Sequence, residues 1–342
     1  MTEIITTINT STITKELLKS MLKAGSTIFR INMSHTKIES AKQLVKQIKQ
    51  VSETEKLPVK IMIDIPGPEL RIANLKIGQT ISPGSTIRIF FKPQRLDCYF
   101  STPINSNAIA VGDKFYLQDG DFHGIVTDVN DTFLIITIND YNLLRPNCHF
   151  AIPGKTLHQS FISPQDKEII RETSTLKPDF FALSFVHSAE DVKEFNDFYT
   201  SLNIEHKPKI LTKIETAKSL VELDQIIEIS DYIYIARGDL GIEVSIPLLP
   251  SIQKYISDKC KVKDKPYFVA TQMMESMITK TSPTRAEITD VANAIFDGAS
   301  GVTLSDETAI GKHPIKAIMW MKRIIDANSC DINKNLQEII KT

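Results

Sequence analysis

Two short apolar segments, Lys209-Ile210-Leu211-Thr212-Lys213 and Tyr232-Ile233-Tyr234-Ile235, decide how this chain folds. Each segment is rich in β-branched or aromatic residues and is too short for a helix, so both are expected to be strands. A helix is expected between them. The order strand, helix, strand is typical of a parallel sheet that is buried on both faces.

The same alternation continues outward from these segments in both directions. Helical stripes of apolar residues, such as those at 14–23 and 40–51, separate further short apolar runs, and a final helix is expected at 315–327. The eight expected strands are 4–8, 27–31, 59–64, 180–183, 209–213, 232–235, 267–270 and 301–304. Eight units in sequence favour the α/β class and a closed (β/α)8 TIM barrel, since an open doubly wound sheet usually has fewer strands.

The alternation is interrupted between the third and the fourth expected strand. Helical periodicity disappears there, and short strand-like runs are separated by turn signals such as Pro83-Gly84 and Asn139-Asp140. This pattern predicts a small inserted all-β domain over residues 74–157. Residues 1–73 and 158–342 are then expected to form the (β/α)8 barrel.

Composition and charge exclude several classes of protein. Of the 342 residues, 42% are hydrophobic and 24% are charged, which is typical of a globular protein with a large core. The 40 Lys and Arg nearly balance the 41 Asp and Glu, so no basic surface is expected to bind nucleic acid. No apolar run is long enough to span a membrane, and the four cysteines lack the spacing of a zinc or disulfide framework. A cytoplasmic enzyme or binding protein is expected.

In a (β/α)8 barrel the active site lies at the carboxyl ends of the strands, so the residues after each strand are the candidates for chemistry. These positions carry many cations and carboxylates, which are expected to meet on one rim of the barrel. They are Arg30, Asn32, Ser34, His35, Asp64, Glu69, Arg71, Lys213, Glu215, Ala236, Arg237, Gly238, Asp239, Thr271, Gln272, Ser305 and Glu307.

Glu215 and Asp239 follow neighbouring strands, so their oxygens could share one hard cation such as Mg²⁺ or Mn²⁺. The alternative is a pair of solvated loop acids, and the position of both beside cations favours the metal. The ammonium group of Lys213 could stabilise negative charge that develops on an oxygen atom. The guanidinium groups of Arg30 and Arg71 could each donate two hydrogen bonds to a phosphoryl group. This set indicates a metal, an anionic substrate and phosphoryl transfer.

Longer motifs at these strand ends resemble those of the pyruvate kinase family, in the family's order and over nearly the whole chain. The matching segments are 29–35 (FRINMSH), 67–71 (GPELR), 183–186 (LSFV), 213–215 (KIE), 236–243 (ARGDLGIE), 270–277 (ATQMMESM), 283–287 (PTRAE), 290–294 (DVANA) and 304–308 (LSDET). So many motifs in the same order as in the family are not explained by coincidence.

The resemblance implies a role for each candidate residue. Glu215 and Asp239 would bind Mg²⁺ or Mn²⁺, and Lys213 would stabilise the transferred phosphoryl group and the enolate. Arg30 and Arg71 would face the phosphates. The backbone of Ala236, Arg237, Gly238 and Asp239 would bind the substrate carboxylate. Thr271 and Ser305 would line the path by which the enolate is protonated.

The resemblance also implies a nucleotide, a monovalent cation and a glycolytic role. Arg30, Asn32, His35 and Arg71 would contact a nucleoside di- or triphosphate, and Asn32, Ser34 and Asp64 would bind K⁺. Phosphoenolpyruvate and pyruvate would be the other ligands. The inserted domain matches the family's lid over the nucleotide, which excludes water.

The sequence departs from the family mainly where nucleotide and potassium are expected to bind. Ile65-Pro66 stands where the family has Thr-Lys, which removes one potassium ligand and one basic group. Asn9-Thr10 replaces a Gly-Pro, Ser40 replaces an aromatic residue, and Gln165 replaces a lysine. The family's C-terminal regulatory domain has no counterpart before Thr342, so the surface that it covers is expected to be polar or buried in a homodimer or homotetramer.

The leading hypothesis is a kinase that interconverts phosphoenolpyruvate and pyruvate with a nucleoside diphosphate as acceptor. One alternative is a specialised paralogue that uses phosphoenolpyruvate with a different acceptor. Another is a metal-dependent lyase or aldolase that acts on a pyruvate enolate, which would not need the phosphoryl-binding arginines. A third is a non-catalytic binding or regulatory protein.

Overall fold

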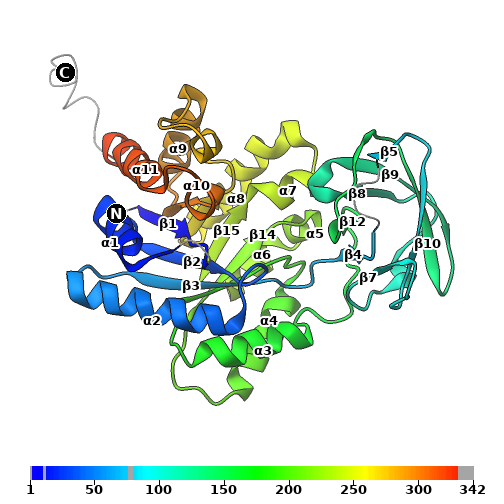
Figure 1. The fold of residues 1–342 in the computed structure, drawn as a ribbon, viewed down its shortest axis with the longest axis horizontal. Helices are drawn as coiled ribbons and strands as arrows, with labels where there is room; N and C mark the ends of the chain where they lie inside the picture. The colour runs from blue at the N-terminus through cyan, green and yellow to red at the C-terminus, as the bar shows by residue number, and fades with distance from the viewer. Residues whose placement is uncertain (1, 11–12, 76–79, 330–342) are drawn as a thin grey trace.

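The computed structural model describes residues 2–10, 13–75 and 80–329. These residues form two closed β-barrels that lie side by side (Figure 1). The larger barrel has parallel strands and is surrounded by helices, whereas the smaller one, at the right of Figure 1, has almost no helical cover.

The larger barrel contains the eight expected strands, so the prediction of a (β/α)8 barrel is confirmed. Neighbouring strands pair in parallel all the way round, and β1 closes the barrel by pairing with both β2 and β17. In spatial order the strands are β1 (Glu3–Thr7), β17 (Gly301–Leu304), β16 (Tyr267–Ala270), β15 (Tyr232–Ala236), β14 (Lys209–Ile214), β13 (Phe180–Leu183), β3 (Lys60–Ile65) and β2 (Ile28–Asn32).

Helices cover the outside of this barrel, and several begin or end at residues that satisfy the free backbone groups. The Thr14 side chain accepts a hydrogen bond from the Leu17 amide, and Gly25 ends the same helix in the left-handed conformation. The helices are α1 (Lys15–Ala24), α2 (Ile38–Glu55), α3 (Pro164–Ser174), α4 (Ala189–Ser201), α5 (Ala217–Val221), α6 (Leu223–Ile229), α7 (Arg237–Glu243), α8 (Leu249–Val262), α9 (Arg285–Phe296), α10 (Asp306–Ala309) and α11 (Pro314–Asn328).

The smaller barrel is built from residues between β3 and α3. Its strand β10 alternates buried and partly exposed residues, which places one face toward a core of aromatic and aliphatic side chains. Its strands, in spatial order, are β10 (Phe133–Ile138), β6 (Thr86–Phe90), β7 (Cys98–Phe100), β4 (Arg71–Ala73), β12 (Cys148–Ala151), β8 (Lys114–Leu117) and β9 (Phe122–Val129). A separate pair joins β5 (Thr80–Ile81) and β11 (Asn142–Leu143).

The strand β4 shows where the chain passes from one barrel to the other. It pairs with β7 and β12, so residues 71–73, which are predicted to belong to the (β/α)8 barrel, are hydrogen-bonded within the smaller barrel. The division at residues 74 and 157 stays a prediction.

Short 3₁₀ helices connect some of these elements. They are η1 (Ser106–Ala108), η2 (Gln118–Gly120), η3 (Ile246–Leu248) and η4 (Glu275–Ile278). Among the described residues, none of the helices combines the length and the apolar character needed to cross a bilayer.

Candidate active site

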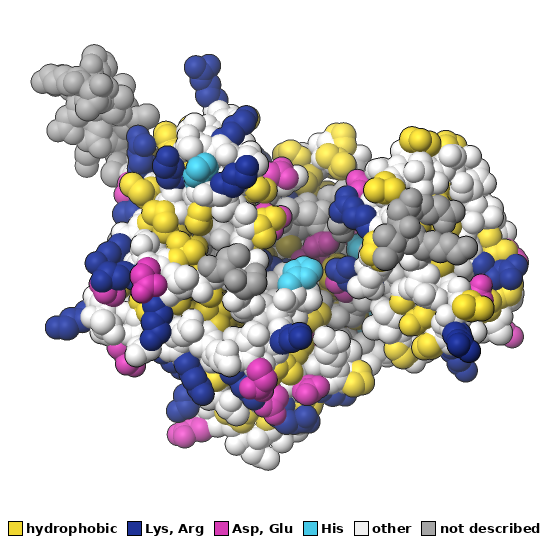
Figure 2. All heavy atoms as spheres, in the orientation of Figure 1, with side chains coloured by type: hydrophobic (Ala, Val, Ile, Leu, Met, Phe, Trp, Pro, Cys, Tyr) yellow, Lys and Arg dark blue, Asp and Glu magenta, His cyan; other side chains and the backbone are white. Residues whose placement is uncertain are grey.

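A cleft lies between the carboxyl ends of the large barrel's strands and the smaller barrel. Figure 2 shows a hollow in this place, with acidic, basic and histidine side chains gathered around it. About 470 Å³ in and around the cleft is not filled by protein atoms, which includes space open to solvent. The charged and histidine side chains that line it are Glu69, His149, Lys155, His158, His187, Glu215, Asp239 and Glu243.

Lys213, at the end of β14, lies among oxygens at the inner end of this cleft. Its Nζ is 2.7 Å from Oε1 of Glu215, 2.9 Å from Oγ of Ser184 and 3.6 Å from Oδ1 of Asp64. Burial alone would lower the pKa of Lys213, but the carboxylates of Asp64 and Glu215 outweigh it and raise the pKa above its ordinary value. Lys213 is therefore a buried, charged ammonium group.

Arg30, on β2, forms a second buried ion pair with the same aspartate. Its Nε and Nη2 atoms each lie 2.6 Å from Oδ2 of Asp64, and its Nη1 donates to Oγ1 of Thr7 at 2.9 Å. Burial alone would raise the pKa of Asp64, yet Lys213 and Arg30 hold it below its usual value. Among the described residues these contacts use three of the five guanidinium N–H groups, so two remain for another anion.

Glu215 has one oxygen that is bound and one that is not satisfied. Its Oε2 accepts a hydrogen bond of 2.7 Å from the Phe185 amide. Its Oε1 is buried and has no hydrogen-bond partner among the described residues, and its contact with Nζ of Lys213 at 2.7 Å is an ion pair. Burial raises the pKa of Glu215, and the charge of Asp239 adds to this effect while Lys213 opposes it.

Asp239 lies in the first turn of α7 and lines the same cleft as Glu215. Two carboxylates from neighbouring strand ends, one with an unsatisfied buried oxygen, are a donor set that suits a hard divalent cation. The residues present therefore fit Mg²⁺ or Mn²⁺.

The segment 236–239 and Thr271 form the next part of the rim. Helix α7 begins at Arg237, and a Cβ added to Gly238 would lie 3.0 Å from Cγ2 of Thr271, so a side chain at 238 would press on Thr271. The Arg237 side chain donates to the Thr271 carbonyl at 2.7 Å and pairs with Asp290 at 2.7 Å. It supports Thr271, whose φ of +74° is unusual for a β-branched residue.

Ser305 lies at the end of β17, beside the end of β16. Its amide donates to Oε2 of Glu307 at 2.7 Å, and Oε1 of Glu307 accepts from the Met274 amide at 3.0 Å. The Glu307 carboxylate therefore connects the segment after β17, which contains Ser305, to the segment after β16, which contains Thr271.

Other predicted site residues make their contacts with residues other than Lys213. Arg71 pairs with Glu69 at 2.7 Å and donates to the Asn147 carbonyl at 2.9 Å, so its side chain contacts the junction with the smaller barrel. Asn32 is paired in register with Asp64, and its Oδ1 accepts from the Ser34 amide. Ser34 and His35 are exposed and line a separate open groove, which also contains Gln165.

The structure adds two residues that have no predicted role. Ser184 donates to the Ile65 carbonyl at 2.7 Å and links Lys213 to Asp64, and Phe185 presents its amide to Glu215 with a left-handed φ of +55°. Both belong to the motif at 183–186, and their place directly after a barrel strand was the available signal.

Comparison with known proteins identifies a matching family. The model of the pyruvate kinase barrel domain matches residues 1–318. The chain belongs to the pyruvate kinase family. It is 36% identical to a pyruvate kinase of Thermotoga maritima over 330 residues, which are 94% of this chain and 70% of that protein. It is 34% identical to a pyruvate kinase of Methylorubrum extorquens over 95% of this chain and 68% of that protein.

Another pyruvate kinase, from Thermoplasma acidophilum, is 34% identical over 95% of this chain but is covered over only 58% of its own length. The similarity therefore extends over both barrels of this chain and over part of its longer relatives.

Proposed function

We propose that this chain transfers the phosphoryl group of phosphoenolpyruvate to ADP or another nucleoside diphosphate, which gives pyruvate and a nucleoside triphosphate. The observation that carries the proposal is the buried ammonium group of Lys213, held 2.7 Å from the partly unsatisfied Glu215 carboxylate. Such an arrangement stabilises negative charge on oxygen while it leaves ligands for a metal.

In this proposal the bond between phosphorus and the enol oxygen breaks, and a bond from phosphorus to a terminal oxygen of the diphosphate forms. The enolate that leaves is then protonated at carbon, on a path lined by Thr271 and Ser305. Lys213 and the free hydrogens of Arg30 neutralise charge on the phosphoryl oxygens. The first amides of α7, at Arg237, Gly238 and Asp239, bind the substrate carboxylate, because they have no partner within the helix.

Glu215 and Asp239 would hold Mg²⁺ or Mn²⁺, which when bound supplies a Lewis acid for the phosphoryl and enolate oxygens. Asn32, Ser34 and Asp64 are the proposed K⁺ ligands, although both oxygens of Asp64 already have protein partners. Arg30, Asn32, His35 and Arg71 are the proposed nucleotide contacts. Assembly into a homodimer or homotetramer remains a prediction.

An assay of the purified chain with phosphoenolpyruvate, ADP, Mg²⁺ and K⁺ tests the proposal. Pyruvate and ATP are expected in equal amounts, and Glu215→Gln is expected to abolish turnover. Formation of neither product by the folded chain would contradict the proposed function.

A different acceptor is the second candidate. It is favoured by Arg71, whose guanidinium group already pairs with Glu69, and by His35, which is exposed and lines a separate groove. If phosphoenolpyruvate is consumed with another acceptor but not with any nucleoside diphosphate, this alternative is correct.

A further inference from the structure

Phe185, which follows β13 closely, has a backbone conformation that other groups must hold in place. Its φ of +55° lies in the left-handed region, which is unfavourable for a residue with a bulky side chain. Its amide donates to Oε2 of Glu215 at 2.7 Å. Its carbonyl oxygen lies 2.9 Å from Nδ1 of His187. The backbone of Phe185 therefore links Glu215, a proposed metal ligand, to His187.

The contact with Phe185 determines where the His187 ring carries its hydrogen. A carbonyl oxygen only accepts hydrogen bonds, so Nδ1 of His187 bears the hydrogen and donates it. Burial, and to a smaller extent the nearby His158, lowers the pKa of His187 to about 4, so the ring is neutral at pH 7. A protonated ring would also carry a hydrogen on Nδ1, so this contact does not depend on the charge of the ring.

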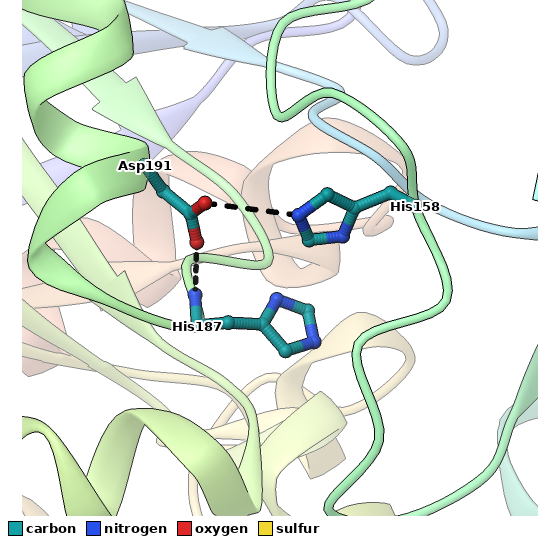
Figure 3. Close-up of side chains that lie close together, drawn as sticks. All are labelled: His158, His187 and Asp191. Carbon is teal, nitrogen blue, oxygen red and sulfur yellow. Dashed lines mark hydrogen bonds and ion pairs between the residues drawn. The ribbon is translucent and has the colours of Figure 1, made fainter. Parts of the chain in front are cut away.

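His187 is itself held by Asp191 and His158, which lie close to it in Figure 3. Oδ2 of Asp191 accepts from the amides of His187 at 2.7 Å and Ser188 at 3.1 Å, which also caps α4. The other oxygen of Asp191 faces Nε2 of His158 at 3.7 Å. The rings of His158 and His187 pack edge to face, with their centroids 4.8 Å apart. These contacts fix both the backbone and the ring of His187.

The Phe185 amide also determines which oxygen of Glu215 is available to a metal ion. While Oε2 is bound to that amide, Oε1 lies 2.7 Å from Nζ of Lys213 and has no hydrogen-bond partner among the described residues. Rotation of the carboxylate would break the hydrogen bond from Phe185. Partners of this kind, behind a metal ligand, contribute to metal affinity because they orient the ligand before the ion binds.

We propose that His187 is a positioning residue for the metal ligand Glu215, and that it acts through the backbone of Phe185. This inference rests on the proposed function, because it takes Glu215 as a ligand of Mg²⁺ or Mn²⁺. His187 holds Phe185 in its left-handed conformation, and the amide of Phe185 then keeps Oε2 of Glu215 in place. Without the Nδ1 donor, Phe185 relaxes toward an ordinary φ and its amide moves relative to Glu215.

Binding of Mn²⁺, followed by the electron paramagnetic resonance signal of the free ion, tests this inference without turnover. His187→Leu removes the donor, and it is expected to weaken Mn²⁺ binding about 10-fold, the lower end of the loss when a group behind a metal ligand is removed. His187→Asn keeps an N–H at the position of Nδ1, so its Mn²⁺ affinity is expected to stay within about threefold of the original chain. In the metal-free chain, the Phe185 amide is expected to exchange its hydrogen faster in His187→Leu than in His187→Asn.

His206→Leu is the matched control. Nε2 of His206 donates to the Pro178 carbonyl at 2.6 Å, so this variant also removes a hydrogen bond from an imidazole to a backbone carbonyl. Pro178 precedes β13 and His206 precedes β14, so the lost bond lies at the amino ends of the strands, away from the cleft. Mn²⁺ affinity and exchange of the Phe185 amide are expected to stay unchanged. Circular dichroism checks that each variant is folded.

The inference is overturned if His187→Leu binds Mn²⁺ as tightly as the original chain, or if His206→Leu weakens binding equally. It is also overturned if His187→Asn binds as weakly as His187→Leu, because the ring would then act by packing and not by its Nδ1 donor. Failure of the proposed metal site gives a different result: Glu215→Gln would bind Mn²⁺ as tightly as the original chain, and this inference would fail with that site.

Discussion

Lys213 retains its charge in the interior because two carboxylates lie near its ammonium group. Lys213→Met keeps most of the side chain's volume but removes the charge that would stabilise the phosphoryl oxygens and the enolate. We expect kcat for phosphoenolpyruvate to fall on the order of 10²–10³-fold, as for loss of one group that stabilises an oxyanion. Steady-state kinetics with phosphoenolpyruvate and ADP measure this.

Lys209→Met is the matched control, because Lys209 lies on the same strand but is exposed and pairs with Asp231 at 2.9 Å. We expect its kcat to stay within about twofold of the original chain, since exposed ion pairs contribute little. Equal losses in the two variants would contradict the role assigned to the buried ammonium group.

The close packing of Gly67 against Ser184 gives a second prediction. Gly67 has a φ of +67°, and a Cβ there would meet the carbonyl oxygen of Ser184, the residue that links Lys213 to Asp64. We expect Gly67→Ala to lower the unfolding free energy by about 1–2 kcal/mol for the left-handed backbone and about 1–3 kcal/mol more for overpacking. Activity should fall as Ser184 shifts.

Gly84→Ala separates the two effects. Gly84 also has a positive φ, +84°, but nothing lies within 4 Å of the added carbon. We expect only the backbone cost of about 1–2 kcal/mol, with activity unchanged. Denaturant unfolding and kcat measure both variants, and equal destabilisation would show that the contact with Ser184 does not matter.

For single residues, the sequence predicted which side chains lie on the rim of the barrel better than it predicted which atoms they contact. Lys213, Glu215 and Asp239 could be predicted because each follows a barrel strand, and such residues share one rim. The link from Ser184 to Asp64 joins residues 120 positions apart, and no local pattern encodes a distance of 3.1 Å between them. The direction of the Arg71 side chain was equally inaccessible, because it depends on Glu69 and on the Asn147 carbonyl.

Among the helices, α2 ends less favourably than α1. Both end at a left-handed residue, but α1 has Gly25 there and α2 has Lys56, with a φ of +56°. We expect Lys56→Gly to raise the unfolding free energy by about 1 kcal/mol, because glycine adopts this conformation without the steric cost. Lys46→Gly, in the exposed interior of α2, should instead lower it by about 1 kcal/mol. Denaturant unfolding of both variants checks the difference in sign.

The start of α3 contains a buried carboxylate, which gives a pH-dependent prediction. Oδ1 of Asp166 is buried without a hydrogen bond in the described residues, while Oδ2 accepts from the Ser163 amide and hydroxyl. Burial raises the pKa of Asp166, so the folded chain keeps this proton to a higher pH than the unfolded chain. Stability should therefore fall as the pH rises from about 4, the unfolded pKa, through the folded pKa.

Asp166→Asn removes that titration but keeps a side-chain oxygen for Ser163. We expect the stability of the variant relative to the original chain to be greater at pH 7 than at pH 4. Urea unfolding at both values measures this. A constant difference would show that Asp166 titrates alike in the folded and unfolded chain.

The regular elements were the part of the fold that the sequence predicted well. Short β-branched runs and helical stripes repeat eight times, and each strand in the larger barrel contains one of these runs. The short segment β4 was harder, because its three residues pair with β7 and β12 and not with sequence neighbours. A strand whose pairing is distant in sequence has no local signal that assigns it to one barrel or the other.

At the scale of the whole molecule, the carboxylate of Glu243 is one of the groups that connect the two barrels. Oε2 of Glu243, the last residue of α7, accepts hydrogen bonds of 3.1 Å from the amide of Gly154, after the last strand of the smaller barrel, and from the amide of Ala217, the first residue of α5. Burial raises the pKa of Glu243, while the two amides oppose this effect. The junction between the barrels is therefore fixed partly by backbone groups that a side-chain motif cannot reveal.

Glu243→Ala is expected to free the amide of Gly154. Hydrogen bonds to charged groups contribute about 1.5–3 kcal/mol, so exchange of that amide should be faster by roughly 10- to 100-fold. Glu243→Gln keeps one acceptor oxygen, so its Gly154 amide should exchange at a rate between those of the original chain and Glu243→Ala. Glu228→Ala removes a carboxylate that is 69% exposed, and it should leave exchange unchanged. Hydrogen exchange of residues 152–156 measures all three, and equal protection of Gly154 in Glu243→Ala and Glu228→Ala would mean that packing alone holds the smaller barrel. Because both barrels line the cleft, a faster-exchanging junction should also raise KM for the nucleotide more than it lowers kcat.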